Sequence, residues 1–338
     1  MLNPFIHWIE AKGPYAPWLF VALFLAASLL MLWRLEVMSS KGFEGTVLGT
    51  LVMPYCSGMG NLIFAIILGR SGGGSGADVM TNSLVNNITN MTLVLGLPAI
   101  FWGIKVLPSK KSNSPKKKTN AAGRTQELNR LSLLLTLLAV LFFTGAVWAL
   151  GHDGKIGFNE GLVLVGLFLF WQCFHVFDVL KSNVQQGKSL SWTLPFDLAL
   201  LAIGAYGIYV STDWLVHWIS NPALTGFVSA KHIGWLSGWL MVLPNAMLAV
   251  YYSWRGQPET VYASQVGDSH VSIPLCVGIY ALYHTMVLPP YFRLAMFILV
   301  GATLVHFFFV ALLGRLSRFA GWALLAAYAF FLWEGLLG

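Results

Sequence analysis

Residues 81–96, TNSLVNNITNMTLVLG, decide the fold of this chain because they place a row of amides inside an apolar segment. Asn82, Asn86 and Asn90 recur at every fourth position, so an α-helix would carry them as one polar stripe. An amide buried in hydrocarbon without a hydrogen-bond partner is strongly disfavoured. The stripe therefore predicts a cavity, an interhelical contact or a binding site within a membrane.

The composition excludes a water-soluble domain. Of 338 residues, 57% are hydrophobic and only 10% are charged, and the mean hydropathy is +0.70. Several apolar runs reach the roughly 20 residues that a membrane-spanning helix needs, and none shows the ten-residue alternation of a membrane barrel. We expect an all-α membrane protein. Cys56, Cys173 and Cys276 lie far apart in apolar runs, so neither a disulfide framework nor a metal-binding cysteine pair is predicted.

Ten membrane spans are predicted, preceded by an interfacial helix anchored by Trp8 and Trp18. The spans are residues 18–35, 45–68, 82–107, 131–150, 160–180, 194–210, 234–254, 261–284, 292–313 and 322–337. Most of the excess positive charge lies in the loop 109–130, so the net charge of +7 is explained by topology and no nucleic-acid partner is expected. With this loop in the cytoplasm, fifteen of the 20 lysines and arginines lie inside and both termini lie outside. We expect a bacterial inner membrane.

The polar stripe has a partner in the second half of the chain, in residues 264–278. The matched pairs at identical spacing are Asn82 and Ser264, Asn86 and Asp268, Asn90 and Ser272, and Gly96 and Gly278. Upstream, Pro54-Tyr55 matches Pro244-Asn245. We therefore predict a first half at 1–180, with its repeat segment at 45–107, and a second half at 181–338, with its repeat segment at 234–284.

An odd number of spans in each half makes the two halves cross the membrane in opposite directions, as in the inverted repeats of secondary transporters. Substrates of such transporters bind near the midplane, where broken helices of the two halves meet. Pro54 and Pro244 are expected to break their helices and free backbone carbonyls. The predicted substrate site takes residues from both copies: Tyr55, Asn86, Asn87, Asn90, Asn245, Asp268, Ser269 and Ser272.

At these residues the chain resembles the cation/calcium exchanger superfamily. Residues 87–97, NITNMTLVLGL, are similar to the family motif GNxxGSNIFNxLLVLG, and residues 153–164, DGKIGFNEGLVL, resemble the entry to its fifth span. The resemblance implies alternating access by a cation antiporter that exchanges its cation for protons or sodium. It implies no cofactor beside the transported ion, such as sodium or calcium. Asn86 and Asn90 match family positions that coordinate ions or hold the broken helices.

The chain differs from the family at the two positions where the family motif has an acidic residue. A glutamate follows each proline in the family motif, whereas this chain has Tyr55 and Asn245. Calcium takes about six to eight oxygens, usually with several carboxylates. Asp268 is the one clear carboxylate of the predicted site, so the site favours a monovalent cation or a proton. If a cation binds, Asp268, Asn86 and Asn90 are its expected ligands.

Ordinary structural roles compete with these assignments. Asp268 could lie at the cytoplasmic end of its span and pair with Arg255, and Tyr55 could serve in helix packing. His306 is deep in the ninth span, where a lone histidine is more often a hydrogen-bonded packing residue than a ligand. Further ionisable residues lie near predicted span ends, where a local salt bridge is the commoner explanation: His175, Asp178, Asp197 and Glu334.

No enzymatic motif is present. The glycine-rich loop SGGGSGAD lacks the lysine and hydroxyl residue of a phosphate-binding loop, and no metalloprotease helix or nucleophile elbow appears. We therefore expect a secondary transporter with the lipid bilayer and a small cation or proton as its partners. Two alternatives stay open: a degenerate exchanger fold that serves as a membrane subunit or scaffold for a protein partner, and a transporter of a different small solute.

Overall fold

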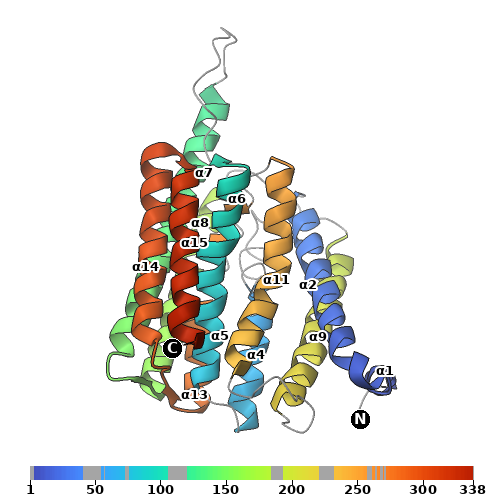
Figure 1. The fold of residues 1–338 in the computed structure, drawn as a ribbon. Coiled ribbons are helices and arrows are strands. Elements are labelled where there is room, and N and C mark those ends of the chain that lie inside the picture. The colour runs from blue at the N-terminus through green and yellow to red at the C-terminus, as the bar shows by residue number, and fades with distance from the viewer. Residues whose placement is uncertain are drawn as a thin grey trace. The chain divides into compact units, whose positions relative to one another are not determined.

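The computed structural model describes residues 4–40, 55–56, 58–72, 76–105, 120–183, 193–220, 232–256, 261–262, 265–266, 269 and 272–337. Its helices are α1 (Pro4–Glu10), α2 (Ala16–Ser40), α4 (Met59–Ser71), α5 (Gly76–Thr89), α6 (Leu95–Phe101), α7 (Asn120–Leu150), α8 (Phe158–Asn183), α9 (Leu194–Ser220), α11 (Ile233–Trp254), α13 (Val277–Tyr283), α14 (Phe292–Phe308) and α15 (Arg318–Leu332). Figure 1 shows these helices.

Shorter elements join or extend the helices. They are the 3₁₀ turn η1 (Gly13–Tyr15), the π-helical turns η3 (Asn90–Val94), η5 (Ser272–Cys276), η6 (Phe309–Leu313) and η7 (Trp333–Leu337), and the strands β1 (Ile104–Lys105), β2 (Lys155–Ile156), β3 (Met286–Val287) and β4 (Arg315–Leu316). The strands form two-residue ladders, β1 with β4 and β2 with β3.

The membrane spans agree with the ten that the sequence predicts. Within the described residues, eight helices are long and apolar enough to cross a membrane: Gly13–Met38, Gly76–Phe101, Arg130–Leu150, Phe158–Phe177, Leu194–Ser220, Ile233–Trp254, Phe292–Leu313 and Arg318–Leu336. Two shorter apolar helices, Met59–Ser71 and Ser272–Tyr283, fall in the predicted second and eighth spans. Each predicted span therefore contains an apolar helix, and the all-α prediction is confirmed.

The chain packs as two compact units that do not follow the sequence halves. Unit 1 is Met1–Ser83, Ile156–Pro244 and Pro274–Val287, and unit 2 is Leu84–Lys155, Asn245–Ile273 and Leu288–Gly338. Each unit draws on both halves of the sequence, and α5 and α11 each contribute their first part to unit 1 and their second part to unit 2. The predicted boundary between the halves 1–180 and 181–338 concerns the duplication of the sequence, and the packing units do not test it. It stays a prediction.

In unit 1, α2 and α9 lie side by side (Figure 1). A small residue allows their backbones to approach, because a Cβ added at Gly204 would lie 2.3 Å from the Met31 Cγ atom and 3.1 Å from the Ala27 carbonyl oxygen. The pair also carries a buried charge contact. Arg34 of α2 forms an ion pair with Asp197 of α9, so the salt-bridge role predicted for Asp197 is what the structure has.

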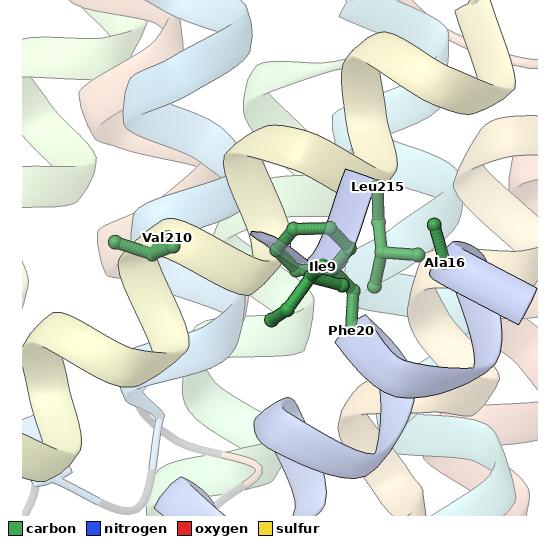
Figure 2. Close-up of a cluster of buried hydrophobic side chains, with 5 residues drawn as sticks. All are labelled: Ile9, Ala16, Phe20, Val210 and Leu215. Carbon is green, nitrogen blue, oxygen red and sulfur yellow. The ribbon is translucent and has the colours of Figure 1, made fainter. Parts of the chain in front are cut away.

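A hydrophobic cluster fixes the N-terminal helix α1 to this pair. Figure 2 shows its side chains, which come from α1, α2 and α9: Ile9, Ala16, Phe20, Val210 and Leu215. Beside the cluster, the indole of Trp214 stacks on Phe20 with ring centroids 4.1 Å apart, and its Nε1–H donates to Glu10 Oε1 at 2.9 Å. A short helix thus precedes the first span, as predicted, and its Trp8 is exposed.

In unit 2, α15 packs against α6 and α14 (Figure 1). The contact with α6 is made by two glycines, since a Cβ added at Gly321 would lie 2.8 Å from the Gly96 carbonyl oxygen. The strands that follow α6 and precede α15, β1 and β4, pair antiparallel, with Ile104 opposite Leu316. The guanidinium of Arg130 on α7 donates to the carbonyl oxygen of Ala311 in η6.

The duplication is visible in the register of the elements. The starts of η3 and η5, of α6 and α13, and of β1 and β3 are each separated by 182 residues (272 − 90, 277 − 95 and 286 − 104). The starts of β2 and β4, and of α8 and α15, are each separated by 160 residues (315 − 155 and 318 − 158). The difference of 22 residues equals the length of the basic loop 109–130. The first half therefore has 22 more residues than the second between β1 and β2, and α7 begins at Asn120, inside the loop that the sequence predicted.

One prediction about the helix breaks is wrong. α11 runs continuously from Ile233 to Trp254 with Pro244 inside it, so Pro244 does not break its helix. A proline removes one backbone donor and crowds the preceding turn, and a helix can continue through such a position with a bend. Pro54, the other predicted break, lies outside the described residues.

Candidate functional site

The asparagine stripe is buried as predicted. Asn86 and Asn87 on α5 and Asn90 at the start of η3 have no solvent-exposed surface. The side-chain Nδ2 of Asn90 donates to Asn86 Oδ1 at 2.8 Å, one helical turn away. In the described part of the chain, Asn86 Nδ2 has no hydrogen-bond partner. The two amides are therefore stacked on one face of the helix and bonded to each other.

The helix that carries the stripe changes its hydrogen bonding at the last asparagine. Residues Gly76–Phe101 form one apolar helix, but Asn90–Val94 adopt the wider π-helical turn η3. Within it, Thr92 donates its hydroxyl to the Ile88 carbonyl, a local bond that competes with regular helix bonding. A π turn inside an α-helix shifts the backbone acceptors and occurs often at functional sites.

Asn82, the first member of the stripe, makes a helix contact within unit 1. Its Nδ2 donates to the Ser237 hydroxyl on α11 at 3.0 Å, and that hydroxyl donates to the Gly234 carbonyl at 3.1 Å. Gly234 is itself close to α5, because an added Cβ would lie 2.7 Å from the Asp78 carbonyl oxygen. For Asn82, the structure supports the interhelical alternative.

The second copy contributes a buried polar segment to unit 2. Asn245, Ser269 and Ser272 are all buried, and Ser272 opens η5 as Asn90 opens η3. The Ser269 hydroxyl donates to the Gln265 carbonyl at 3.2 Å. Asp268 and Ser264 lie outside the described residues, so the predicted role of Asp268 stays a prediction.

Gln265 is a polar residue that sequence reasoning missed. Its side chain is fully buried, and Nε2 donates to the Asn245 backbone carbonyl at 3.2 Å. Its Oε1 has no hydrogen-bond partner among the residues described. A buried amide oxygen of this kind is a potential cation ligand. The sequence feature that could have identified Gln265 is its position directly after Ser264, inside the predicted span 261–284.

Tyr55 lies half-buried in unit 1. Its ring meets Phe168 of α8 edge to face, with centroids 5.7 Å apart. This contact is the packing role that the sequence left open for Tyr55. A role for its hydroxyl in the substrate site stays a prediction.

His306 of α14 connects the two polar segments of unit 2. Its Nε2 lies 2.7 Å from the Met91 carbonyl oxygen in η3, and its Nδ1 is hydrogen-bonded to the Tyr262 hydroxyl. His306, Met91 and Tyr262 are all completely buried. The predicted hydrogen-bonded packing residue is confirmed, whereas Tyr262 was missed because nothing in its local sequence marks a partner 44 residues away.

The polar residues of the predicted site that the structure describes are neutral. Asn86, Asn87, Asn90 and Ser272 are buried amides and a buried hydroxyl, and Gln265 is a further buried amide. In the same described residues, no group of three or more histidine, cysteine or acidic side chains could hold a metal ion. Amide and hydroxyl oxygens can replace part of the hydration shell of a small cation, and the carboxylate predicted beside them is Asp268.

Comparison with known proteins identifies the family. Residues 16–177 and 196–334 match the family model described as sodium/calcium exchanger protein. The chain belongs to this family. A relative by sequence is an uncharacterised membrane protein of Methanocaldococcus jannaschii, 25% identical over 248 residues, which are 73% of each chain.

Solved structures give the same exchanger fold. A structure of the sodium-calcium exchanger NCX_Mj soaked with Na⁺ and Sr²⁺ has a TM-score of 0.64 at 21% identity, covering 94% of this chain and 96% of that chain. Another, at a different Na⁺ concentration, has a TM-score of 0.63 at 23% identity, covering 93% and 95%. This protein is therefore an all-α, multi-pass membrane protein with two inverted repeats, in a family of cation antiporters.

Proposed function

We propose that this exchanger-family protein is a secondary antiporter that moves a small cation in exchange for protons or sodium by alternating access. The observation that carries the proposal lies in unit 2. The described polar residues of both repeats are buried there, each repeat has a π turn at a matched position, and the Tyr262–His306–Met91 hydrogen bonds connect the two repeats. Buried polar groups inside a membrane protein usually mark a transport path.

The proposed substrate is a monovalent cation. The positions after the two matched prolines are Tyr55 and Asn245, so neither supplies a carboxylate. Calcium sites usually combine about six to eight oxygens with several carboxylates, and this site has Asp268 as its single candidate. One carboxylate with amide and hydroxyl oxygens suits Na⁺ or a proton. We assign Asp268 as the group that couples the two ions, with Asn86, Asn90 and Ser272 as neutral ligands.

The proposal includes an orientation. The basic loop 109–130 lies in the cytoplasm of a bacterial inner membrane and both termini lie outside, because lysine and arginine are retained on the inner side. The cation would then exchange between the cytoplasm and the exterior.

The substitution Asp268→Asn tests the coupling role. In proteoliposomes loaded with Na⁺ or with acid buffer, the wild-type protein should take up labelled Na⁺, K⁺ or Ca²⁺ only against a counter-ion, with Na⁺ preferred. Asp268→Asn should abolish this uptake, because a neutral amide cannot take and release a proton or balance a cation. The variant should elute and unfold as the wild type does.

Asp213→Asn on α9 is the matched control, since it removes one carboxylate from a half-exposed side chain paired with His217. It should leave uptake unchanged. Undiminished exchange by Asp268→Asn would remove Asp268 from the mechanism. If the wild-type protein moves none of the ions, the scaffold alternative, favoured by the loss of both glutamates, takes its place.

A further inference from the structure

We infer that His306 is a positioning residue for the cation site: it holds the π turn that begins at Asn90 and ties this turn to the segment of Gln265. The inference rests on the proposed transport function. The side chain of His306 is hydrogen-bonded to the Met91 carbonyl and to the Tyr262 hydroxyl, so its role is to place the predicted ligands beside these groups. Three observations carry the inference.

The first observation is the protonation that the partners impose on the imidazole. A backbone carbonyl only accepts, so the 2.7 Å contact with Met91 requires the proton on Nε2. In a neutral ring Nδ1 is then an acceptor, and the Tyr262 hydroxyl donates to it. Both nitrogens of a neutral, fully buried ring are therefore satisfied by groups from two other segments.

The second observation is the place of the accepting carbonyl. Met91 directly follows Asn90, whose amide donates to Asn86, and both α14 and α15 pack against η3. If the π turn reverted to α-helical bonding, the residues before and after it would rotate relative to each other by about 100°, one residue of a 3.6-residue turn. A donor fixed on the Met91 carbonyl opposes that change and keeps Asn90 in register.

The third observation is that the residue at the equivalent position of the first half cannot make this bond. The 160-residue offset of β2 to β4 points to Ala146 as the equivalent of His306, and the 159-residue offset between Thr144 and Thr303, whose hydroxyls each donate four residues back, points to Val147. Neither residue has a side-chain donor, so neither can make the bond of His306. A bond needed only to build the repeat would be expected in both copies.

The other end of the bridge reaches the second polar segment. Tyr262 lies three residues before Gln265, and the Gln265 amide in turn donates to the Asn245 carbonyl. Through its two hydrogen bonds, His306 links a backbone group of the first repeat to the Tyr262 side chain of the second. The distance between the neutral ligands of the two copies should therefore depend on His306.

The test compares His306→Ala, His306→Gln and Tyr262→Phe in Na⁺ transport. Glutamine keeps an N–H donor near the position of the histidine Nε2, so His306→Gln should keep the Na⁺ KM within about threefold of the wild type. His306→Ala should raise that KM by about tenfold or more with a smaller change in maximal rate, and Tyr262→Phe should lie between the two. Because the imidazole stays neutral, the pH profile of exchange should be the same in wild type and His306→Gln.

Thr303→Val is the matched control. Thr303 is buried one turn before His306 on α14, but its hydroxyl donates to Leu299 of the same helix at 2.7 Å. Loss of the Thr303 hydroxyl removes a buried hydrogen bond but leaves the Tyr262–His306–Met91 hydrogen bonds in place, so the KM for Na⁺ should not change. If His306→Ala does not fold, His306→Gln and Tyr262→Phe still decide the outcome.

Unchanged Na⁺ KM in both His306→Ala and Tyr262→Phe would overturn the inference. Equal loss of transport in His306→Ala and His306→Gln, with a shifted pH profile, would also overturn it and make His306 a proton carrier. Amide hydrogen exchange separates this failure from failure of the proposed function. His306→Ala should lose protection at residues 91–96, and His306→Gln and Thr303→Val should not, even if the wild-type protein transports no cation.

Discussion

At the scale of single residues, the buried polar groups of this protein are arranged in short chains of contacts. Neutral amides bond to a neighbouring turn or helix, as Asn90 does to Asn86 and Asn82 to Ser237. The charged pair Arg34–Asp197 is different, because each ion would be left alone in a low-dielectric surrounding if its partner were removed. The Thr193 hydroxyl also donates to Asp197 Oδ2, at 3.1 Å.

Removing one member of the ion pair should be costly. Arg34→Ala should lower the free energy of unfolding by about 3–5 kcal/mol, since it leaves Asp197 buried and uncompensated. Thermal unfolding in detergent measures the effect, and Arg293→Ala, at an exposed arginine on α14, is the control. The double variant Arg34→Met with Asp197→Leu should recover most of the loss. A single variant as stable as the wild type would show that the pair is solvated.

The sequence could predict these residues only where spacing or local chemistry marks them. The four-residue period identified Asn82, Asn86 and Asn90, and their burial follows from it. Gln265 and Tyr262 could not be found in this way, because their partners lie 20 and 44 residues away. Hydrogen bonds between distant segments depend on how the helices pack, and the spacing of residues within one helix does not predict this.

At the scale of elements, close helix contacts depend on glycines that face another backbone. Gly161 on α8 packs against α13, and an added Cβ would lie 2.7 Å from Ala281 Cβ and 2.9 Å from the Gly278 carbonyl oxygen. Gly278 is the residue that the sequence paired with Gly96, and Gly96 likewise lies against Gly321. The two matched glycines thus serve the same purpose, a close helix crossing.

A methyl group at this crossing should separate the helices. Gly161→Ala should lower the free energy of unfolding by about 1–3 kcal/mol, as overpacking does in well-packed cores. Gly166 lies on the same helix with nothing within 4 Å of an added Cβ, so Gly166→Ala should be neutral or stabilise by up to about 1 kcal/mol through helix propensity. Thermal unfolding of both variants in one detergent makes the comparison. Equal melting temperatures would mean that the crossing can yield.

The end of the third predicted span was set by backbone conformation and not by the hydrophobic pattern. The hydrophobic pattern extended the third span to residue 107, whereas α6 ends at Phe101. Gly103 adopts a positive φ of 69° shortly after, a conformation that stops a helix and that glycine adopts without strain. The π turns at Asn90 and Ser272 were likewise not predictable, because one extra residue in a turn leaves no periodic trace.

At the scale of the whole molecule, the duplication explains most of what could be predicted. Matched polar positions between Asn82 and Gly96 have the same offset of 182 residues as the turns, helices and strands from η3 to β1, so this part of the repeat was recoverable from spacing alone. The division into two packing units was not, since each unit combines segments that are distant in the chain. Such a division depends on which side chains meet after folding.

The orientation of the chain is the last prediction, and it follows from the charge distribution. In a background with Cys56, Cys173 and Cys276 replaced by alanine, Lys117→Cys in the basic loop should react with a membrane-impermeant maleimide only after the membrane is opened. Lys155→Cys, at an exposed residue in β2 one span later, should react in intact cells. The positive-inside rule places the first residue in the cytoplasm, and a single crossing places the second outside. Labelling of Lys117→Cys in intact cells would reverse the orientation, and labelling of both sites from one side would contradict the crossing by α7 between them.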